Sequence, residues 1–169
     1  MRIKAKASPF CHLPIVDMTE GQRTMYKHIL IPTDGSSLAM TAVKQGLDFA
    51  KAIGAEVTAL TVFEPFHLLT LETDMLTDTP EIYHRHAKAE AKATLAKVEA
   101  LAKARGVACH PIEVESDHPY EAIIEAAKKH KCDLIAMASH GRKGIQSVLL
   151  GSETQKVLTH SSLPVLVYR

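Results

Sequence analysis

Short runs of residues that favour β-strands alternate along this chain with stretches of helical periodicity, and few folds accommodate that order. Five such runs lie at residues 28–33, 57–62, 109–114, 134–139 and 164–168. Between them, apolar residues recur every three or four positions, which places them on one face of a helix. The runs lack a regular alternation of apolar and polar residues, as is typical of strands covered on both faces. The pattern predicts a three-layer α/β/α fold around a five-stranded parallel sheet.

Capping signals mark the ends of two of the predicted helices. Gly54 and Gly106 follow the first and second helical stretches, at the position where a glycine commonly ends a helix. Thr79 and Pro80 predict the start of the second helix, because Thr caps a helix and Pro suits its first turn. The helical stretches therefore have defined ends as well as apolar faces.

Length and composition favour one globular domain. The chain has 169 residues, of which 46% are hydrophobic, enough for one core. Residues 1–24 show no periodicity, so we expect an N-terminal appendage followed by a domain over residues 25–169. The formal net charge is +1 and no long run of Lys or Arg is present. This argues against nucleic-acid binding through a broad basic face and against attraction to anionic membranes.

The cysteines and histidines carry no metal-binding pattern. The three cysteines form no CxxC pair, and the ten histidines have no thiol or carboxylate partners at ligand spacing. An odd number of cysteines without such spacing is typical of free thiols in a reducing compartment. The N-terminal segment is interrupted by polar and proline residues, which makes it a poor signal peptide, and no apolar run is long enough to span a membrane. We therefore expect a cytoplasmic protein without a metal site.

Candidate site residues follow the predicted strands. In parallel sheets of this kind, ligands bind beyond the carboxyl ends of the strands, where the strand order reverses. Segments 32–36 and 138–144 follow the first and fourth strands, and segment 151–155 opens the last helix. There, Gly151 would let a ligand approach the backbone, and Ser152 would offer a hydroxyl beside the N–H groups that favour an anion. The sequence thus predicts a phosphate-bearing ligand at this edge.

Each of these segments also has a purely structural explanation. Ser152 and Gln155 have the spacing of a capping box, in which the two side chains close the start of a helix. Asp34 and Ser36 could likewise form only a turn and a helix cap. Their joint placement at one edge of the sheet favours a binding site.

Two sequence motifs resemble the signature of the universal stress proteins. Residues 139–142 read Ser-His-Gly-Arg, and residues 149–152 read Leu-Leu-Gly-Ser. The ending Pro-Val-Leu-Val at residues 164–167 is also similar to that family, and the resemblance extends from Met25 to Arg169. It implies a Rossmann-like fold of the adenine nucleotide alpha hydrolase-like type.

The ATP-binding members of that family have an Asp after the first strand and a Gly-x2-Gly-x9-Gly-Ser/Thr pattern after the fourth. Here Asp34 matches the former, while Gly141, Gly151 and Ser152 match most of the latter. Ala138 stands in place of the first glycine, a change that a negative φ would tolerate and a positive φ would not. The resemblance therefore implies ATP as the ligand, with or without magnesium.

The family's site can be carried over residue by residue. The resemblance places Pro32, Thr33 and Asp34 at the adenosine part of the ligand, Val62 at the adenine, and Met137 and Ala138 on the ribose side. Around the phosphates it places Gly141, Gly151, Ser152, Glu153 and Thr154. Val62 would contact adenine through its backbone. Glu153 would repel a phosphate unless its side chain points to solvent or to a metal.

The resemblance implies a nucleotide-binding stress-response or regulatory protein that forms a homodimer through its C-terminal strand. No P-loop is present, and neither a catalytic triad nor a pair of catalytic carboxylates can be assigned, so we expect slow or absent turnover. One alternative is a slow nucleotide hydrolase or transferase with His140 as its base. Another is a dimeric interaction module that binds no nucleotide.

Overall fold

The computed structural model describes residues 26–66, 79–141 and 150–169, and the predicted N-terminal appendage lies outside them. Strands and helices alternate along the chain, as predicted. The elements are β1 (His28–Pro32), α1 (Ser37–Ile53), β2 (Glu56–Phe63), α2 (Pro80–Arg105), β3 (Cys109–Glu115), α3 (Pro119–Lys129), β4 (Leu134–Ala138), α4 (Ser152–His160) and β5 (Val165–Tyr168).

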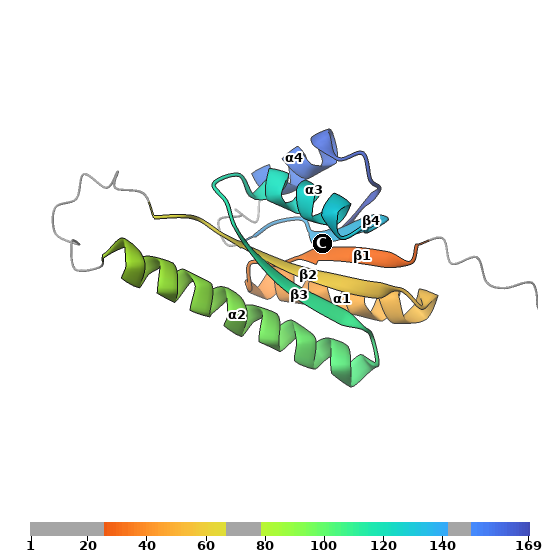
Figure 1. Cartoon of the computed structure of the whole chain (residues 1–169). Coiled ribbons are helices and arrows are strands. Elements are labelled where there is room, and N and C mark those ends of the chain that lie inside the picture. The colour runs from red at the N-terminus through yellow and green to blue at the C-terminus, as the bar shows by residue number, and fades with distance from the viewer. Residues whose placement is uncertain (1–25, 67–78, 142–149) are drawn as a thin grey trace, which may run out of the picture.

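All strand pairs in the sheet are parallel, and the strand order is β3-β2-β1-β4-β5. Helices α1 and α2 cover one face, and α3 and α4 cover the other (Figure 1). The prediction of a three-layer α/β fold is confirmed. The order reverses between β1 and β4, so the chain leaves these neighbouring strands toward opposite faces. Ligands of such sheets bind above this point.

The continuous apolar runs arise because each strand contributes to two cores. Ile29 and Ile31 of β1 pack toward α1 and α2, whereas Leu30 between them packs toward α3 and α4. In β4, Ala136 and Ile135 divide in the same way. Because successive side chains of a strand point to opposite faces, a sheet covered on both sides needs apolar residues at every position.

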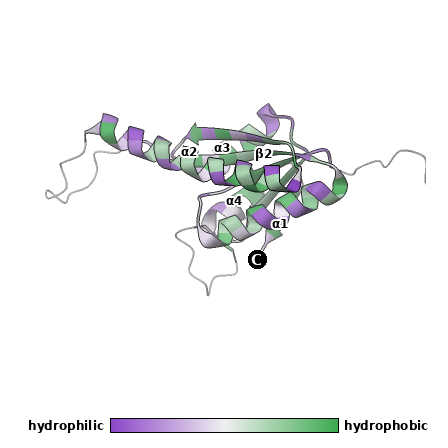
Figure 2. Ribbon diagram, turned by 90° about the horizontal axis from the view of Figure 1, so that it is seen from below, coloured by the Kyte–Doolittle hydropathy of each residue, from purple (hydrophilic) through white to green (hydrophobic). Residues whose placement is uncertain are grey.

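Local capping chemistry sets the helix bounds. The Ser36 hydroxyl accepts a hydrogen bond from the N–H of Ala39 at the start of α1, and Thr79 caps α2 in the same way. Gly54 and Gly106 end these helices with φ of 70° and 71°, a left-handed conformation that favours glycine. Figure 2 shows hydrophilic and hydrophobic residues interleaved along α1 and α2, as expected for helices with one buried face.

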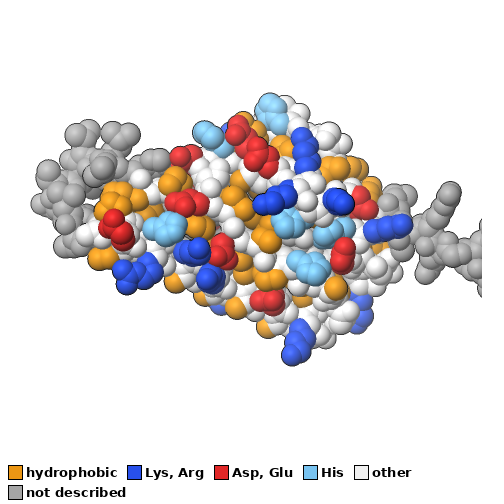
Figure 3. All heavy atoms as spheres, in the orientation of Figure 1, with side chains coloured by type: hydrophobic (Ala, Val, Ile, Leu, Met, Phe, Trp, Pro, Cys, Tyr) orange, Lys and Arg blue, Asp and Glu red, His pale blue; other side chains and the backbone are white. Residues whose placement is uncertain are grey.

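The visible surface carries charges of both signs. In Figure 3, acidic and basic side chains are interspersed over the described residues, and this face has no broad patch of a single sign. This agrees with the near-zero net charge of the sequence. None of the helices in the described part of the chain is long and apolar enough to cross a membrane.

Helix α2 is longer than the strand that it covers. Its 26 residues span about 39 Å, whereas the eight residues of β2 span about 26 Å. Because α2 runs opposite to the strands, its first turns extend past their carboxyl ends (Figure 1). The helix thereby adds a wall above the edge of the sheet where a ligand would bind.

Candidate functional site

A cavity of about 730 Å³ lies at the carboxyl edge of the sheet. The ends of β1, β2 and β4 form its floor, and the first turns of α3 and α4 and the overhang of α2 form its walls. Every residue that the sequence predicted for the site lines this one cavity: Pro32, Thr33, Asp34, Val62, Met137, Ala138, Gly141, Gly151, Ser152, Glu153 and Thr154. Residues far apart in the sequence thus meet at the switch point of the sheet.

The exit of β1 is held by hydrogen bonds to β2. The Thr33 N–H donates to the Leu60 carbonyl at 2.8 Å, and the Thr61 hydroxyl donates to the Thr33 carbonyl at 3.1 Å. Beyond it, the Asp34 Oδ1 accepts a hydrogen bond from the Ser36 N–H at 3.0 Å. The predicted turn and cap are therefore present, and they hold the Asp34 carboxylate beside the cavity.

Gly141 shows how closely the exits of β1 and β4 approach each other. A Cβ at this position would lie 2.6 Å from the Asp34 Oδ2, closer than real contacts allow. The Asp34 carboxylate cannot easily retreat, because its other oxygen accepts the Ser36 N–H. Any larger residue here would therefore require a shift of the Asp34 side chain, which lies 107 positions earlier in the chain.

The alanine that replaces the first glycine of the family pattern fits without strain. Among the described residues, Lys131 is the one non-glycine residue with a positive φ, so Ala138 does not need the freedom of glycine. Its methyl group packs with Ala39 and Ala42 of α1. The substitution therefore adds an apolar contact on the α1 side of the sheet.

The first turn of α4 is fixed to the end of β4 by two hydrogen bonds. The Gly151 N–H donates to the Ser139 carbonyl at 2.8 Å, and the buried Thr154 hydroxyl donates to the Ala138 carbonyl at 3.0 Å. A Cβ on Gly151 would lie 3.3 Å from the Ser139 oxygen and 3.4 Å from the His140 Cα. Gly151 therefore lets α4 begin directly against the chain that leaves β4.

Among the described residues, no side-chain capping bond is present at the start of α4. Its N-cap residue is Gly151, with a φ of −69° and no side-chain capping bond, so the capping box of Ser152 and Gln155 does not form. The start of a helix carries N–H groups without partners within the helix and the positive end of the helix dipole. Here that end borders the cavity, an arrangement that suits an anion.

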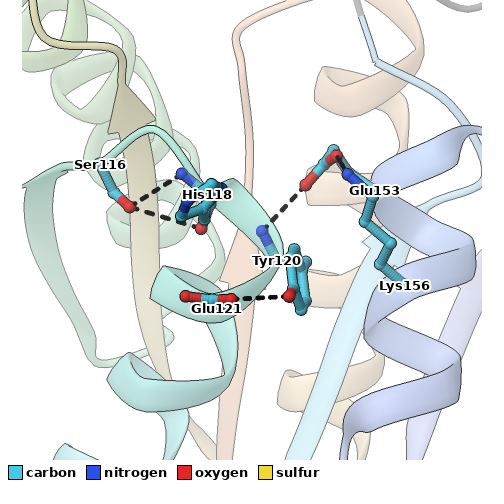
Figure 4. Close-up of polar contacts among 6 residues, drawn as sticks. All are labelled: Ser116, His118, Tyr120, Glu121, Glu153 and Lys156. Carbon is cyan, nitrogen blue, oxygen red and sulfur yellow. Dashed lines mark hydrogen bonds and ion pairs between the residues drawn. The ribbon is translucent and has the colours of Figure 1, made fainter.

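The Glu153 carboxylate points toward α3. Its Oε2 accepts a hydrogen bond from the Tyr120 N–H at 2.9 Å, and its Oε1 forms an ion pair of 2.8 Å with Lys156 (Figure 4). The repulsion expected between this carboxylate and a phosphate is thereby reduced, because both of its oxygens are engaged away from the N–H groups of α4.

His140 contributes a half-buried imidazole to the cavity lining. Its Nδ1 lies 3.1 Å from the Ser139 hydroxyl, and its Nε2 is buried without a hydrogen-bond partner in the described part of the chain. A buried imidazole nitrogen without a partner is uncommon, and it has the capacity for a hydrogen bond to a ligand.

The wall formed by α2 was missed by sequence reasoning, which considered only segments that follow strands. Five residues of this helix line the cavity: Tyr83, Ala87, Glu90, Ala91 and Thr94. The signal was present in the excess length of the second helical stretch over its strands. A helix that returns antiparallel to the sheet must extend past the carboxyl edge when it is too long.

The described lining of the cavity is rich in carboxylates. It includes Asp34, Glu64, Glu90, Asp117 and Glu153, together with one histidine, and none of its described residues is Lys or Arg. Two cations of the predicted phosphate segment, Arg142 and Lys143, lie outside the described residues. No group of three His, Cys, Asp or Glu side chains suited to a metal was found within ranges 26–66, 79–141 and 150–169.

A parallel α/β sheet with a cavity at its switch point places this chain in the doubly wound class of α/β folds. The chain belongs to the universal stress protein family, whose model matches residues 25–169. The recognition of this family from the two sequence motifs is confirmed.

Known relatives resemble the chain over most of their length. The universal stress protein MJ0531 of Methanocaldococcus jannaschii is 37% identical over 147 residues, which cover 86% of this chain and 83% of that protein. The solved structure of MJ0577 is 31% identical, with a TM-score of 0.68 over 85% of this chain and 95% of that one. A universal stress protein solved in complex with cAMP is 26% identical, with a TM-score of 0.63 over 85% and 97% of the two chains.

Proposed function

We propose that this protein binds an adenine nucleotide, with ATP as its main ligand, and acts in stress response or regulation through ligand binding. The observation that carries the proposal is the uncapped start of α4, which borders the cavity formed by all the predicted site residues. A family relative in complex with cAMP supports an adenine nucleotide as the ligand class.

The acidic lining supports entry of the nucleotide together with a divalent cation. Carboxylates outnumber cations in the described lining of the cavity, and magnesium bound to the phosphates of ATP would reduce the repulsion between the nucleotide and this lining. Magnesium is usually held by one or two carboxylates plus phosphate oxygens rather than by a protein cage. Asp34 and Asp117 are lining carboxylates that fit this role.

The decisive experiment asks whether the protein carries and binds nucleotide. Purified protein is acid-extracted and the extract is analysed for nucleotides, after which the stripped protein is titrated calorimetrically with ATP, ADP and cAMP, with and without magnesium. We expect adenine nucleotide in the extract and tighter ATP binding with magnesium than with EDTA. An empty extract, together with no binding at millimolar nucleotide, would reject the proposal and favour the interaction module.

We also propose a homodimer that forms through β5. This strand is at the edge of the sheet, and its four residues are only partly buried. An exposed apolar edge favours pairing with another strand. Light scattering at micromolar concentration should give twice the monomer mass, and replacing Val165 and Val167 with Lys should lower it. A monomer mass for the wild type would contradict the proposal.

One observation favours slow nucleotide hydrolysis as a second candidate function. The buried Nε2 of His140 lacks a partner in the described residues, and a general base needs such a nitrogen within reach of a water molecule. Nucleotide hydrolysis that is lost in His140→Ala but kept in His160→Ala would establish this candidate, and a rate of about one turnover per second or faster would make the protein an enzyme in the ordinary sense. His160 is a suitable control because it is the last residue of α4. We expect a much lower rate, because no second catalytic group is assigned.

A further inference from the structure

The first turn of α3 has one N–H group that its own helix does not satisfy. Pro119 has no N–H, and the N–H groups of Glu121 and Ala122 both donate to the His118 carbonyl. His118 is the N-cap, yet its side chain makes no capping bond, and its own N–H donates to the Ser116 hydroxyl. The Tyr120 N–H is the donor that remains.

Glu153 of α4 satisfies this donor. Its Oε2 accepts the Tyr120 N–H at 2.9 Å, although the two residues are 33 positions apart (Figure 4). A carboxylate at the start of a helix also interacts favourably with the helix dipole. Glu153 therefore does for α3 what Ser36 does for α1, but from another helix. We call this bond the inter-helix cap.

Neighbouring side chains support the inter-helix cap. Lys156 pairs with the other carboxylate oxygen of Glu153 at 2.8 Å, and its Nζ lies 5.3 Å from the centroid of the Tyr120 ring. The Tyr120 hydroxyl donates to Glu121 at 2.6 Å, on the side away from Glu153. The carboxylate is thus held between an amide of α3 and an ammonium group of its own helix.

The inter-helix cap joins two walls of the cavity. Asp117, Pro119 and Ile123 line the cavity at the start of α3, whereas Ser152 and Thr154 line it at the start of α4. The first turn of α4 is already bonded to β4 through two carbonyl groups. The bond from Tyr120 to Glu153 ties the first turn of α3 to this fixed turn.

We propose that Glu153 is a positioning residue for nucleotide binding, acting through the inter-helix cap. The cap holds the α3 wall at the distance from the α4 turn that the ligand requires, and it directs a carboxylate away from the N–H groups that receive the phosphates. Binding of the nucleotide in the cavity and ordering of the first turn of α3 then stabilise each other. This inference rests on the proposed nucleotide binding for its ligand.

The test compares Glu153→Ala with the conservative variant Glu153→Gln, which keeps an amide oxygen that can accept the Tyr120 N–H. Amide hydrogen exchange of the ligand-free full chain measures the cap, and calorimetry with magnesium ATP measures affinity. In Glu153→Ala we expect the Tyr120 amide to exchange about tenfold faster and ATP to bind about three- to tenfold more weakly. In Glu153→Gln both values should return to within about twofold of the wild type.

Glu125→Ala is the matched control, because it removes an exposed carboxylate from α3 without touching Tyr120 or the inter-helix cap. It should leave ATP affinity and Tyr120 exchange unchanged. Unchanged Tyr120 exchange in Glu153→Ala would overturn the proposal, as would an equal loss of affinity in the Ala and Gln variants. If the wild type binds no ATP, the proposed function fails and so does the role of Glu153 in binding, whereas exchange in the ligand-free protein still decides whether the cap exists.

Discussion

Helices α1 and α4 both begin at the carboxyl edge of the sheet, yet their first turns are built differently. At α1, the Ser36 hydroxyl accepts the Ala39 N–H, and the Asp34 carboxylate accepts the Ser36 N–H. At α4, the N-cap is Gly151, and no side-chain capping bond is present among the described residues. The same edge therefore presents one helix start that a side chain caps and one that has no such cap in the described part of the chain, where we propose that the ligand binds.

The other two helices follow the pattern of α1. Thr79 caps α2 with its own hydroxyl, and α3 receives the carboxylate of Glu153. Three of the four described helices thus have a side chain at their first turn. A helix start without a cap leaves N–H groups that its own helix does not satisfy, so the start of α4 is where our proposal places an oxygen atom of the ligand.

The largest expected effect comes from Gly151→Leu. The added side chain would meet the Ser139 carbonyl and the His140 backbone, which lie 3.3 and 3.4 Å from the first added carbon. Leucine should therefore displace the α4 turn, abolish measurable ATP binding and lower the free energy of unfolding by about 1–3 kcal/mol. Calorimetric titration and denaturant melting measure the two effects. Gly151→Ala should show a smaller loss of both, because the φ of −69° suits alanine.

A folded Gly151→Leu variant with the ATP affinity of the wild type would show that the phosphates do not bind at this turn. If only stability falls and the wild type binds no nucleotide, Gly151 serves packing alone. The comparison between α1 and α4 would then reflect the tight junction of α4 with β4 rather than a ligand site.

Thr154→Val should have the next largest effect, because it leaves the uncapped turn less firmly attached. Valine has nearly the shape of threonine but cannot donate to the Ala138 carbonyl, and the site is almost fully buried. Leaving such an acceptor unpaired costs about 1–3 kcal/mol of stability. We expect that loss in urea melting, together with weaker ATP binding. Thr159→Val, which removes an exposed hydroxyl from the same helix, should change little.

A pair of serine variants tests the contrast between the two helix starts directly. Ser36→Ala removes a cap, so it should lower stability by about 0.5–2 kcal/mol and leave ATP affinity nearly unchanged. Ser152→Ala should do the reverse, because its hydroxyl makes no capping bond but would contact a phosphate, a bond of about 0.5–1.5 kcal/mol or more. Equal losses of stability in both variants would contradict the proposed difference between the starts of α1 and α4.

The smallest expected effect concerns the opposite edge of the sheet, where Cys109 and Cys132 lie. Burial raises the pKa of both thiols from an ordinary value of 9.0 to about 11. The thiolate is the reactive form, so iodoacetamide should label them slowly at pH 7.5, and the rate should rise about tenfold per pH unit up to pH 10.

The experiment uses Cys11→Ser to remove the third thiol and urea-unfolded protein as the fast control. The pKa values of the two thiols are higher in the folded protein than in the unfolded chain. Their contribution to the free energy of unfolding is therefore complete below pH 9 and is lost as the pH rises through about 11. Rapid labelling of the folded protein at neutral pH would show that solvent reaches this edge of the sheet as easily as it reaches the carboxyl edge.

The sequence predicted the parts of this structure that depend on neighbouring residues. Helix α4 begins at Ser152 and ends at His160, as the periodicity indicated, and Gly54, Gly106 and Thr79 end or begin helices where expected. The order of strands and helices was also predictable, because apolar periodicity is a local property that burial on two faces imposes. That the segments after the first and fourth strands and the start of the last helix meet at one edge followed from parallel topology, whereas the individual site residues came from the family resemblance.

Tertiary structure decided the contacts between residues far apart in the chain. The close approach of Gly141 to Asp34 and the packing of Ala138 on α1 depend on how β1, α1 and β4 lie together. The bond from Tyr120 to Glu153 depends on how α3 and α4 dock on the sheet. Local sequence favoured a capping box at Ser152, and the docked structure left it unformed. Sequence periodicity determines which face of an element is buried, but the partner of each polar group is set only when the elements pack together.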